Sequence, residues 1–440
     1  MKKHEPFAGL QPVKNASGIV ALITFFYVML VGVFTYNFHL PRTALYFSDI
    51  LNVVLLVLCA REVPKALSFK RTRVFYIVLG LLLLEGTLSA AFQGFHVLWW
   101  VWSLRNWGRF FLYFLLCTIA LDRNAIELTV RLVKYIFHLN FVVILGQFFI
   151  GRGYYGQDQL NGLYGREVNG VTITMILIML CITYSEYFSG RCTWKSLIAV
   201  SFEVNLLSCI SELRGVFFIQ IALLIFYPLI NVREKEFYKK KWKELIICYA
   251  VIAGMIGLAA YGLGKIYAEF AGFLTVESAV EAATTEGGSG YSGEVDRLTF
   301  ISVINEHIFD AFGIGGKAFG VGMGNAEYAS FGALTSSLYN KIGENIFYLH
   351  FSSATIYLEA GIVGLILYAA ANAVLFCQGT WNVVKRNGDR FYESVGAGAA
   401  LVSLVYIIYN NLQRTDMAIL LALFIAVPVA VKFHEAKEKV

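Results

Sequence analysis

Repeated apolar runs of about 17 residues or more, the length that crosses a bilayer, constrain this 440-residue chain more than any other feature. Hydrophobic residues make up 58% of the sequence and charged residues 15%, whereas a soluble domain carries about 25% charged residues. The polar start, residues 1–15, is not typical of a cleaved signal peptide. We therefore expect an all-α polytopic membrane protein.

The apolar runs predict about twelve transmembrane helices, with one large extracytoplasmic loop between spans nine and ten. The predicted spans are residues 17–37, 44–60, 74–93, 97–120, 133–150, 169–187, 196–212, 215–231, 244–263, 352–376, 392–410 and 417–432. Residues 1–263 then hold nine spans, residues 264–351 form the loop, and residues 352–440 hold three spans and a tail. Lys and Arg concentrate in loops that share one side with the N-terminus, so both ends are expected in the cytoplasm.

The net charge of +6 is explained by these inner loops, which face anionic lipid, so nucleic-acid binding is not expected. Most of the seven cysteines lie in apolar runs, where a free cysteine behaves as a small hydrophobic residue. Neither a disulfide framework nor a zinc-ligand spacing is present, and we expect no metal site.

Spans three and four hold three charged residues, Glu85, Arg105 and Arg109, at positions where charge is costly and usually functional. Glu85 lies about ten residues before the turn near Gly94, and Arg105 about ten after it, so both sit about 15 Å from the turn. Equal depth predicts a Glu85–Arg105 ion pair. Arg105 and Arg109 share a helix face; they are either structural or form a basic wall for an anionic head group.

Arg214 lies in a short break, residues 211–215, between spans seven and eight. Irregular backbone at a helix end is tolerated where it is buried in protein or lines a water-filled cavity. A simple tight turn with a Glu212–Arg214 pair is the alternative interpretation.

Residues 297–364 include the longest part of the chain that is not plainly a span. Arg297 precedes an amphipathic run, residues 298–312, and six glycines follow within twelve residues. No strand precedes the glycines and no Gly-Lys-Ser/Thr follows them, which excludes a nucleotide-binding loop. A turn-rich connector and a nest of backbone N–H groups for an anion both remain open.

His350 precedes span ten. A lone histidine is more often structural than catalytic. Glu359 follows nine residues later, which turns an unbroken helix through about 900° and places it on the opposite face. Glu359 is therefore expected to be structural.

Taken in order, these features resemble the O-antigen polymerase (Wzy-type) and O-antigen ligase family over about 200 residues from Asn169 onward. The family carries a Ser-Arg-Gly break between two middle spans, an arginine that opens an amphipathic helix ending in glycines, and a histidine followed at fixed spacing by Gly-x-x-Gly. The matching positions are Leu213-Arg214-Gly215 with Ser211 displaced, Arg297 through Gly313 and Gly315, and His350 through Gly361 and Gly364, where Phe351 departs from the family's polar residue. Residues 162–170 also resemble the family's loop before span six.

The resemblance implies a glycosyltransferase, independent of metal and cofactor, in the bacterial cytoplasmic membrane. It would polymerise undecaprenyl-diphosphate-linked oligosaccharide repeat units into a surface polysaccharide, O-antigen or capsule, on the extracytoplasmic face. Arginine suits the departing diphosphate because its fork binds phosphate bidentately and stays charged, and histidine suits a base near neutral pH. The catalytic residues expected are His350, Arg214 and Arg297.

The substrate-binding residues expected are Arg105, Arg109, Arg166, Asn169, Gly313, Gly315 and Asn345. The expected partners are the lipid-linked donor and acceptor, membrane lipid, a chain-length regulator and a flippase.

Three other functions stay open at this point. A ligase of the same family would transfer the finished glycan to a lipid core or a protein, and the sequence does not separate it from a polymerase. A transporter or flippase is disfavoured by the absence of an internal repeat and by the long loop. A structural membrane subunit would leave the outer arginines and His350 unexplained.

Overall fold

The computed structural model describes residues 12–151, 159–165, 169–266 and 295–438, and all regular structure within these ranges is helical. Eight of the described helices are long and apolar enough to cross a membrane. They are α1 (Ala16–Gly32), α4 (Arg73–Gln93), α6 (Arg123–Gly151), α7 (Asn169–Ser189), α10 (Lys235–Ile266), α15 (Ser352–Lys385), α16 (Arg390–Tyr409) and α17 (Ala418–Lys437). The chain thus has the architecture of a membrane protein.

Four further helices coincide with the remaining predicted spans: α2 (Phe47–Cys59), α5 (Val97–Ala120), α8 (Trp194–Ile210) and α9 (Arg214–Ile230). These four helices do not combine the length and the apolar composition that the eight candidate spans have. Of the four, α2 and α9 are apolar but shorter. A helix therefore lies at each predicted range, and eight of them have the dimensions of a span.

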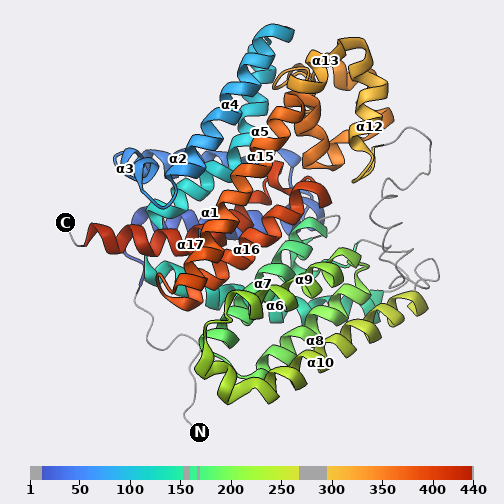
Figure 1. Ribbon diagram of the computed structural model, residues 1–440. Helices are drawn as coiled ribbons and strands as arrows, with labels where there is room; N and C mark the ends of the chain where they lie inside the picture. Colours follow the sequence, from blue (N-terminus) through green and yellow to red (C-terminus); the bar gives the residue numbers. More distant parts are fainter. Residues whose placement is uncertain (1–11, 152–158, 166–168, 267–294, 439–440) are drawn as a thin grey trace.

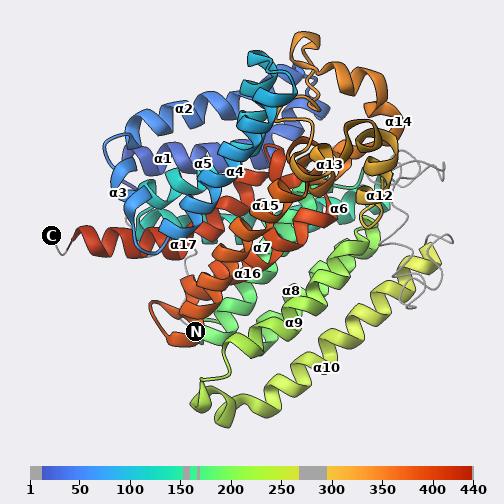
Figure 2. The ribbon, with the colours of Figure 1, turned by 45° about the horizontal axis from the view of Figure 1, so that its top comes forward.

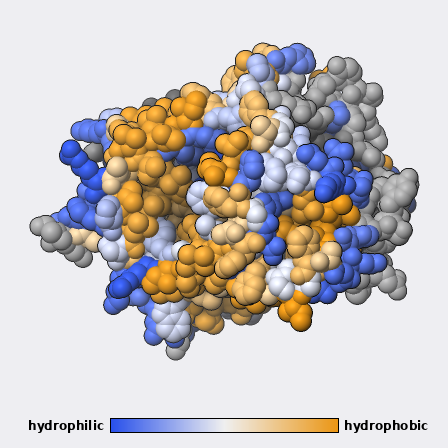
Figure 3. Space-filling model, turned by 90° about the horizontal axis from the view of Figure 1, so that it is seen from above, coloured by the Kyte–Doolittle hydropathy of each residue, from blue (hydrophilic) through white to orange (hydrophobic). Residues whose placement is uncertain are grey.

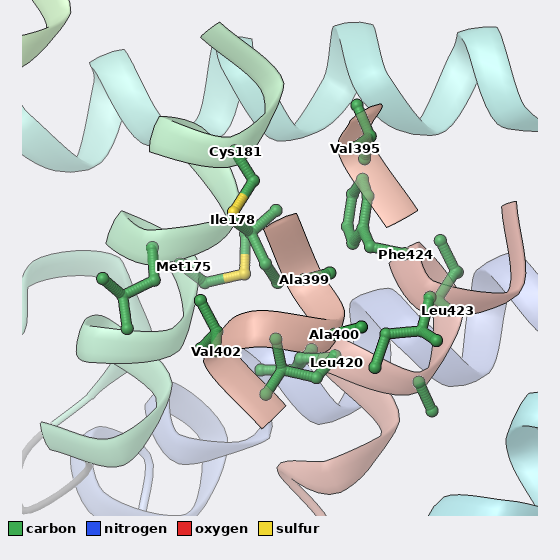
Figure 4. Packing of buried hydrophobic residues seen from close by; sticks show 14 of the residues in the cluster. Met175, Ile178, Cys181, Val395, Ala399, Ala400, Val402, Leu420, Leu423 and Phe424 are labelled. Atoms are coloured by element: carbon green, nitrogen blue, oxygen red, sulfur yellow. The ribbon is translucent and has the colours of Figure 1, made fainter. Parts of the chain in front are cut away.

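The centre of the bundle is formed by α7, α16 and α17, and almost all of α7 is buried. Small residues on α16 let its neighbours approach closely, as is common between membrane helices. A Cβ at Gly396 would lie 2.5 Å from Pro428 of α17, and one at Gly398 would lie 2.2 Å from the Tyr227 hydroxyl of α9. Figure 4 shows side chains of α7, α16 and α17 interdigitating around Ala399 and Ala400.

The C-terminal helices are packed into the N-terminal ones rather than set apart: α15 lies along α4 and α16, and α17 lies along α5 (Figure 1). At the periphery α10 runs beside α8 (Figure 2), and only a small part of α10 is buried. Apolar side chains form a broad patch on the face seen in Figure 3, with hydrophilic residues around it. Such a surface suits contact with lipid.

The connecting segment, residues 295–351, covers one end of α15. Its predicted amphipathic helix is present as α12 (Phe300–Ile304), a π-helical turn and α13 (Asp310–Phe319), with a kink at Gly313. Apolar residues of this helix, including Phe300 and Phe309, pack on Tyr357 of α15. The acidic stretch that the sequence places at 277–293 lies outside the described residues.

The connecting segment crosses α15 in close backbone contact, with Gly320 on the connecting segment and Gly361 on α15. A Cβ at Gly361 would lie 2.3 Å from the Ala318 carbonyl, and one at Gly320 would lie 2.4 Å from the carbonyl carbon of Glu359. Both glycines have positive φ, 62° and 72°, and Gly361 kinks α15 at this point. The crossing therefore requires glycine on both segments.

Substituting either crossing glycine tests this arrangement. Gly361→Ala should destabilise the protein by about 2–4 kcal/mol, because a left-handed backbone angle and overpacking both oppose the new methyl group. Gly315→Ala is the matched control, since its Cβ would meet nothing within 4 Å. The measurement is thermal unfolding in detergent; equal midpoints for the two variants would contradict the crossing.

Candidate functional site

A cavity of about 520 Å³, here called the arginine–histidine cavity, collects four of the residues that the sequence singles out. Arg214, Arg297, His350 and Asn169 all line it. Its remaining walls come mainly from the α8–α9 break and from the α16–α17 connection, residues 410–417. Residues more than 180 positions apart in the sequence are thus brought to one space.

Arg214 is placed by the break between α8 and α9. The Leu213 N–H donates to the Ser208 carbonyl (2.9 Å), which closes α8, and Glu212 has a positive φ of 55°. Arg214 is then the first residue of α9. The glycine that follows has a steric reason, because a Cβ at Gly215 would lie 2.0 Å from the Tyr409 hydroxyl.

The same tyrosine positions Arg297. The Arg297 Nε donates to the Tyr409 carbonyl (3.0 Å), and the guanidinium lies 4.4 Å from the centre of the Tyr409 ring. Arg297 is buried, and burial lowers its pKa, an effect that Tyr409 opposes and the nearby charge of Arg214 reinforces. Arg214 and Arg297 are therefore close enough to influence each other electrostatically.

His350 ends a short 3-10 turn just before α15 and is exposed to the cavity. The backbone on either side of it is tied to the α16–α17 connection. Asn411 donates its side-chain amide to the Leu349 carbonyl (2.6 Å), and the Ser352 N–H donates to the Asn410 carbonyl (3.1 Å). This pair of bonds fixes His350 at the cavity wall.

Other predicted substrate-binding residues lie elsewhere. Gly313, Gly315 and Asn345 are exposed and do not line the cavity, and Arg166 lies outside the described residues.

Two N–H groups in the second half of the glycine segment bond to Glu359 and are therefore not available to an anion. Gly322 N–H donates to the Glu359 carbonyl (2.9 Å), and Gly324 N–H donates to the Glu359 carboxylate (3.0 Å). Substrate binding by Gly313 and Gly315 stays a prediction.

Arg105 and Arg109 line a second cavity of about 440 Å³, here called the paired-charge cavity, together with Trp102, Tyr46, Glu327 and Arg414. Asn411, Thr415 and Met417 line both cavities. The two spaces therefore meet at the α16–α17 connection.

The predicted Glu85–Arg105 pair does not form. Arg105 donates to Asp49 of α2 (Nε–Oδ2 2.9 Å) and lies 3.7 Å from Asp416, while Arg109 pairs with Asp416. Both oxygens of Glu85 are buried without a hydrogen-bond partner. Depth from a turn fixes a position along the helix axis, but the rotation of α5 turns Arg105 toward α2.

Sequence reasoning missed the α16–α17 connection and Tyr409. A signal was present, because residues 410–416 form a polar run, Asn-Asn-Leu-Gln-Arg-Thr-Asp, between two apolar helices. Within the described ranges, no group of three His, Cys, Asp or Glu side chains is placed to hold a metal ion.

Searches against models of known protein families and against curated proteins found no match.

The corrected pairing gives a test. Asp416→Asn should lower the free energy of unfolding by about 1–3 kcal/mol, because it leaves two arginines without their shared acceptor. Glu85→Gln should leave stability unchanged or raise it, because it removes a carboxylate that has no partner. Thermal unfolding in detergent compares them, and a Glu85→Gln loss as large as that of Asp416→Asn would show that Glu85 has a partner.

Proposed function

We propose that this protein is a membrane glycosyltransferase of the O-antigen polymerase and ligase kind, and that it polymerises undecaprenyl-diphosphate-linked repeat units into a surface polysaccharide. The observation that carries the proposal is the arginine–histidine cavity. Its lining includes Arg214, Arg297 and His350, the three residues to which the family resemblance assigns the chemistry. Their shared cavity is an argument independent of the motifs.

The two arginines hold the diphosphate of the donor. As the bond to the sugar breaks, the departing diphosphate gains negative charge, and fixed cations lower the barrier. Guanidinium groups bind phosphate oxygens through paired N–H bonds. Arg297 is held over the Tyr409 ring and by the Tyr409 carbonyl, so it needs little reorganisation when the donor binds.

His350 takes the proton of the acceptor hydroxyl. The hydroxyl oxygen bonds to the anomeric carbon of the donor sugar, the bond between that carbon and the diphosphate oxygen breaks, and the electron pair leaves with the diphosphate. The exposed ring of His350 at the cavity wall suits this role. The arginines then act on the leaving diphosphate and His350 on the attacking hydroxyl, at the two bonds of one reacting carbon.

In this proposal the protein lies in the bacterial cytoplasmic membrane with both ends in the cytoplasm and the cavities on the opposite side. A flippase supplies the lipid-linked units, and a chain-length regulator is a further partner.

Deleting the gene and resolving the surface glycan on a gel tests the activity. If the deletion strain carries a single repeat unit on the acceptor, the protein is a polymerase. If the strain loses all attached glycan, the protein is a ligase.

Arg214→Lys and Arg297→Lys should each remove most polymerising activity, because a point charge does not reproduce the bidentate fork. The assay uses the purified full-length protein with a lipid-linked donor. Arg73→Lys is the matched control, because Arg73 is exposed at the start of α4 and lines neither cavity. Full polymer length in either cavity variant would contradict diphosphate binding there.

His350→Ala should reduce turnover by about 100- to 10,000-fold, the usual contribution of a general base. His350→Gln separates proton transfer from orientation, because an amide can orient a hydroxyl but does not accept its proton at neutral pH. His307→Gln, on the same connecting segment and exposed, is the control. Near wild-type turnover of His350→Gln would leave leaving-group stabilisation by the arginines as the main catalytic effect.

A further inference from the structure

The arginines that line the paired-charge cavity are each compensated by a carboxylate. Arg105 bonds to Asp49, Arg109 pairs with Asp416, and Arg414 pairs with Glu327. Three arginines thus face three carboxylates. A cavity of this kind offers many donors and acceptors but little net charge to attract an anion.

Aromatic side chains add an apolar surface to this polar cavity. Trp102 and Tyr46 both line it, with ring centres 5.9 Å apart. The Arg105 guanidinium lies 4.4 Å from the Trp102 ring centre, and the indole N–H donates to the Tyr328 carbonyl (3.0 Å). Both contacts fix the indole in place, so the aromatic surface is preorganised.

This combination matches the chemistry of a sugar. A sugar ring has apolar C–H faces, which pack on aromatic rings, and a rim of uncharged hydroxyls, which exchange hydrogen bonds with amide, carboxylate and guanidinium groups. The volume, about 440 Å³, lies within the range of about 300–1,000 Å³ usual for small-ligand sites.

The paired-charge cavity shares a wall with the arginine–histidine cavity, and this wall determines which end of a bound sugar faces His350. Leu349 lines the paired-charge cavity, and the next residue, His350, lines the other. Asn411, which lines both, donates to the Leu349 carbonyl. The wall of the paired-charge cavity therefore continues directly into His350.

We propose that the paired-charge cavity binds the terminal, uncharged sugars of the acceptor glycan and directs a hydroxyl across the shared wall to His350. This inference rests on the proposed function, because it assigns the second substrate of the same reaction. It gives Trp102 a positioning role for the sugar and Arg105 a structural role, in place of contact with an anionic head group.

The test measures binding of a lipid-free oligosaccharide, released from the source strain's surface polysaccharide, to the full-length protein in nanodiscs. Trp102→Ala should weaken binding about tenfold, whereas Trp102→Phe should retain most of it. Trp381→Ala is the matched control, because Trp381 is exposed near the far end of α15. Wild-type protein that does not bind the oligosaccharide, or Trp102→Ala that binds it equally well, would overturn the proposal.

A second pair of variants makes the test independent of whether Trp102→Ala folds. Ser330 is exposed and lines the cavity, so Ser330→Trp should block the oligosaccharide, while Ala333→Trp, exposed nearby and outside the lining, should not. Inorganic diphosphate should not compete; competition would mean that this is an anion site. If the Arg214 and Arg297 variants remain active while these binding results hold, the proposed donor site fails and the sugar site stands.

Discussion

One buried carboxylate, that of Glu359, joins the connecting segment to the helix bundle. It accepts hydrogen bonds from the Ser103 hydroxyl (2.8 Å), the Trp107 indole N–H (2.9 Å) and the backbone N–H groups of Gly324 (3.0 Å) and Ala326 (3.3 Å). A carboxylate within a membrane helix is costly without such partners. Because the donors come from α5 and from the connecting segment, both are held against α15 by the same side chain.

Arg414 extends this arrangement to the α16–α17 connection. It pairs with Glu327 and lies 4.0 Å from Glu359, and Asn106 donates to Glu327 (3.0 Å). All four side chains are buried. Removing one member of such a network leaves the others desolvated without a partner, so the wall between the two cavities depends on the whole network rather than on any single bond.

Much of the fold could be predicted because the length of an apolar run is a local property of the sequence. The range predicted for α5, residues 97–120, agrees with the helix that forms, and Glu359 was expected to be structural. Pairing between helices is not local. Glu85 and Arg105 have the required depth, yet Asp49 of α2 is the partner, because helix rotation and the order of neighbours are decided by packing throughout the bundle.

The residues of the candidate site also fall into two groups, those that the sequence identifies and those that only the packing reveals. His350 and the two arginines were identifiable because their residue types are chemically unusual where they occur. Tyr409 has no such signal; it matters because its ring and carbonyl hold Arg297 while its hydroxyl packs against Gly215. The glycines are a different case, because the sequence left two interpretations of them open. A glycine-rich stretch indicates close backbone approach, but the sequence does not say whether an anion or another part of the protein approaches. At Gly322 and Gly324 the approaching group is α15, because Glu359 accepts both N–H groups.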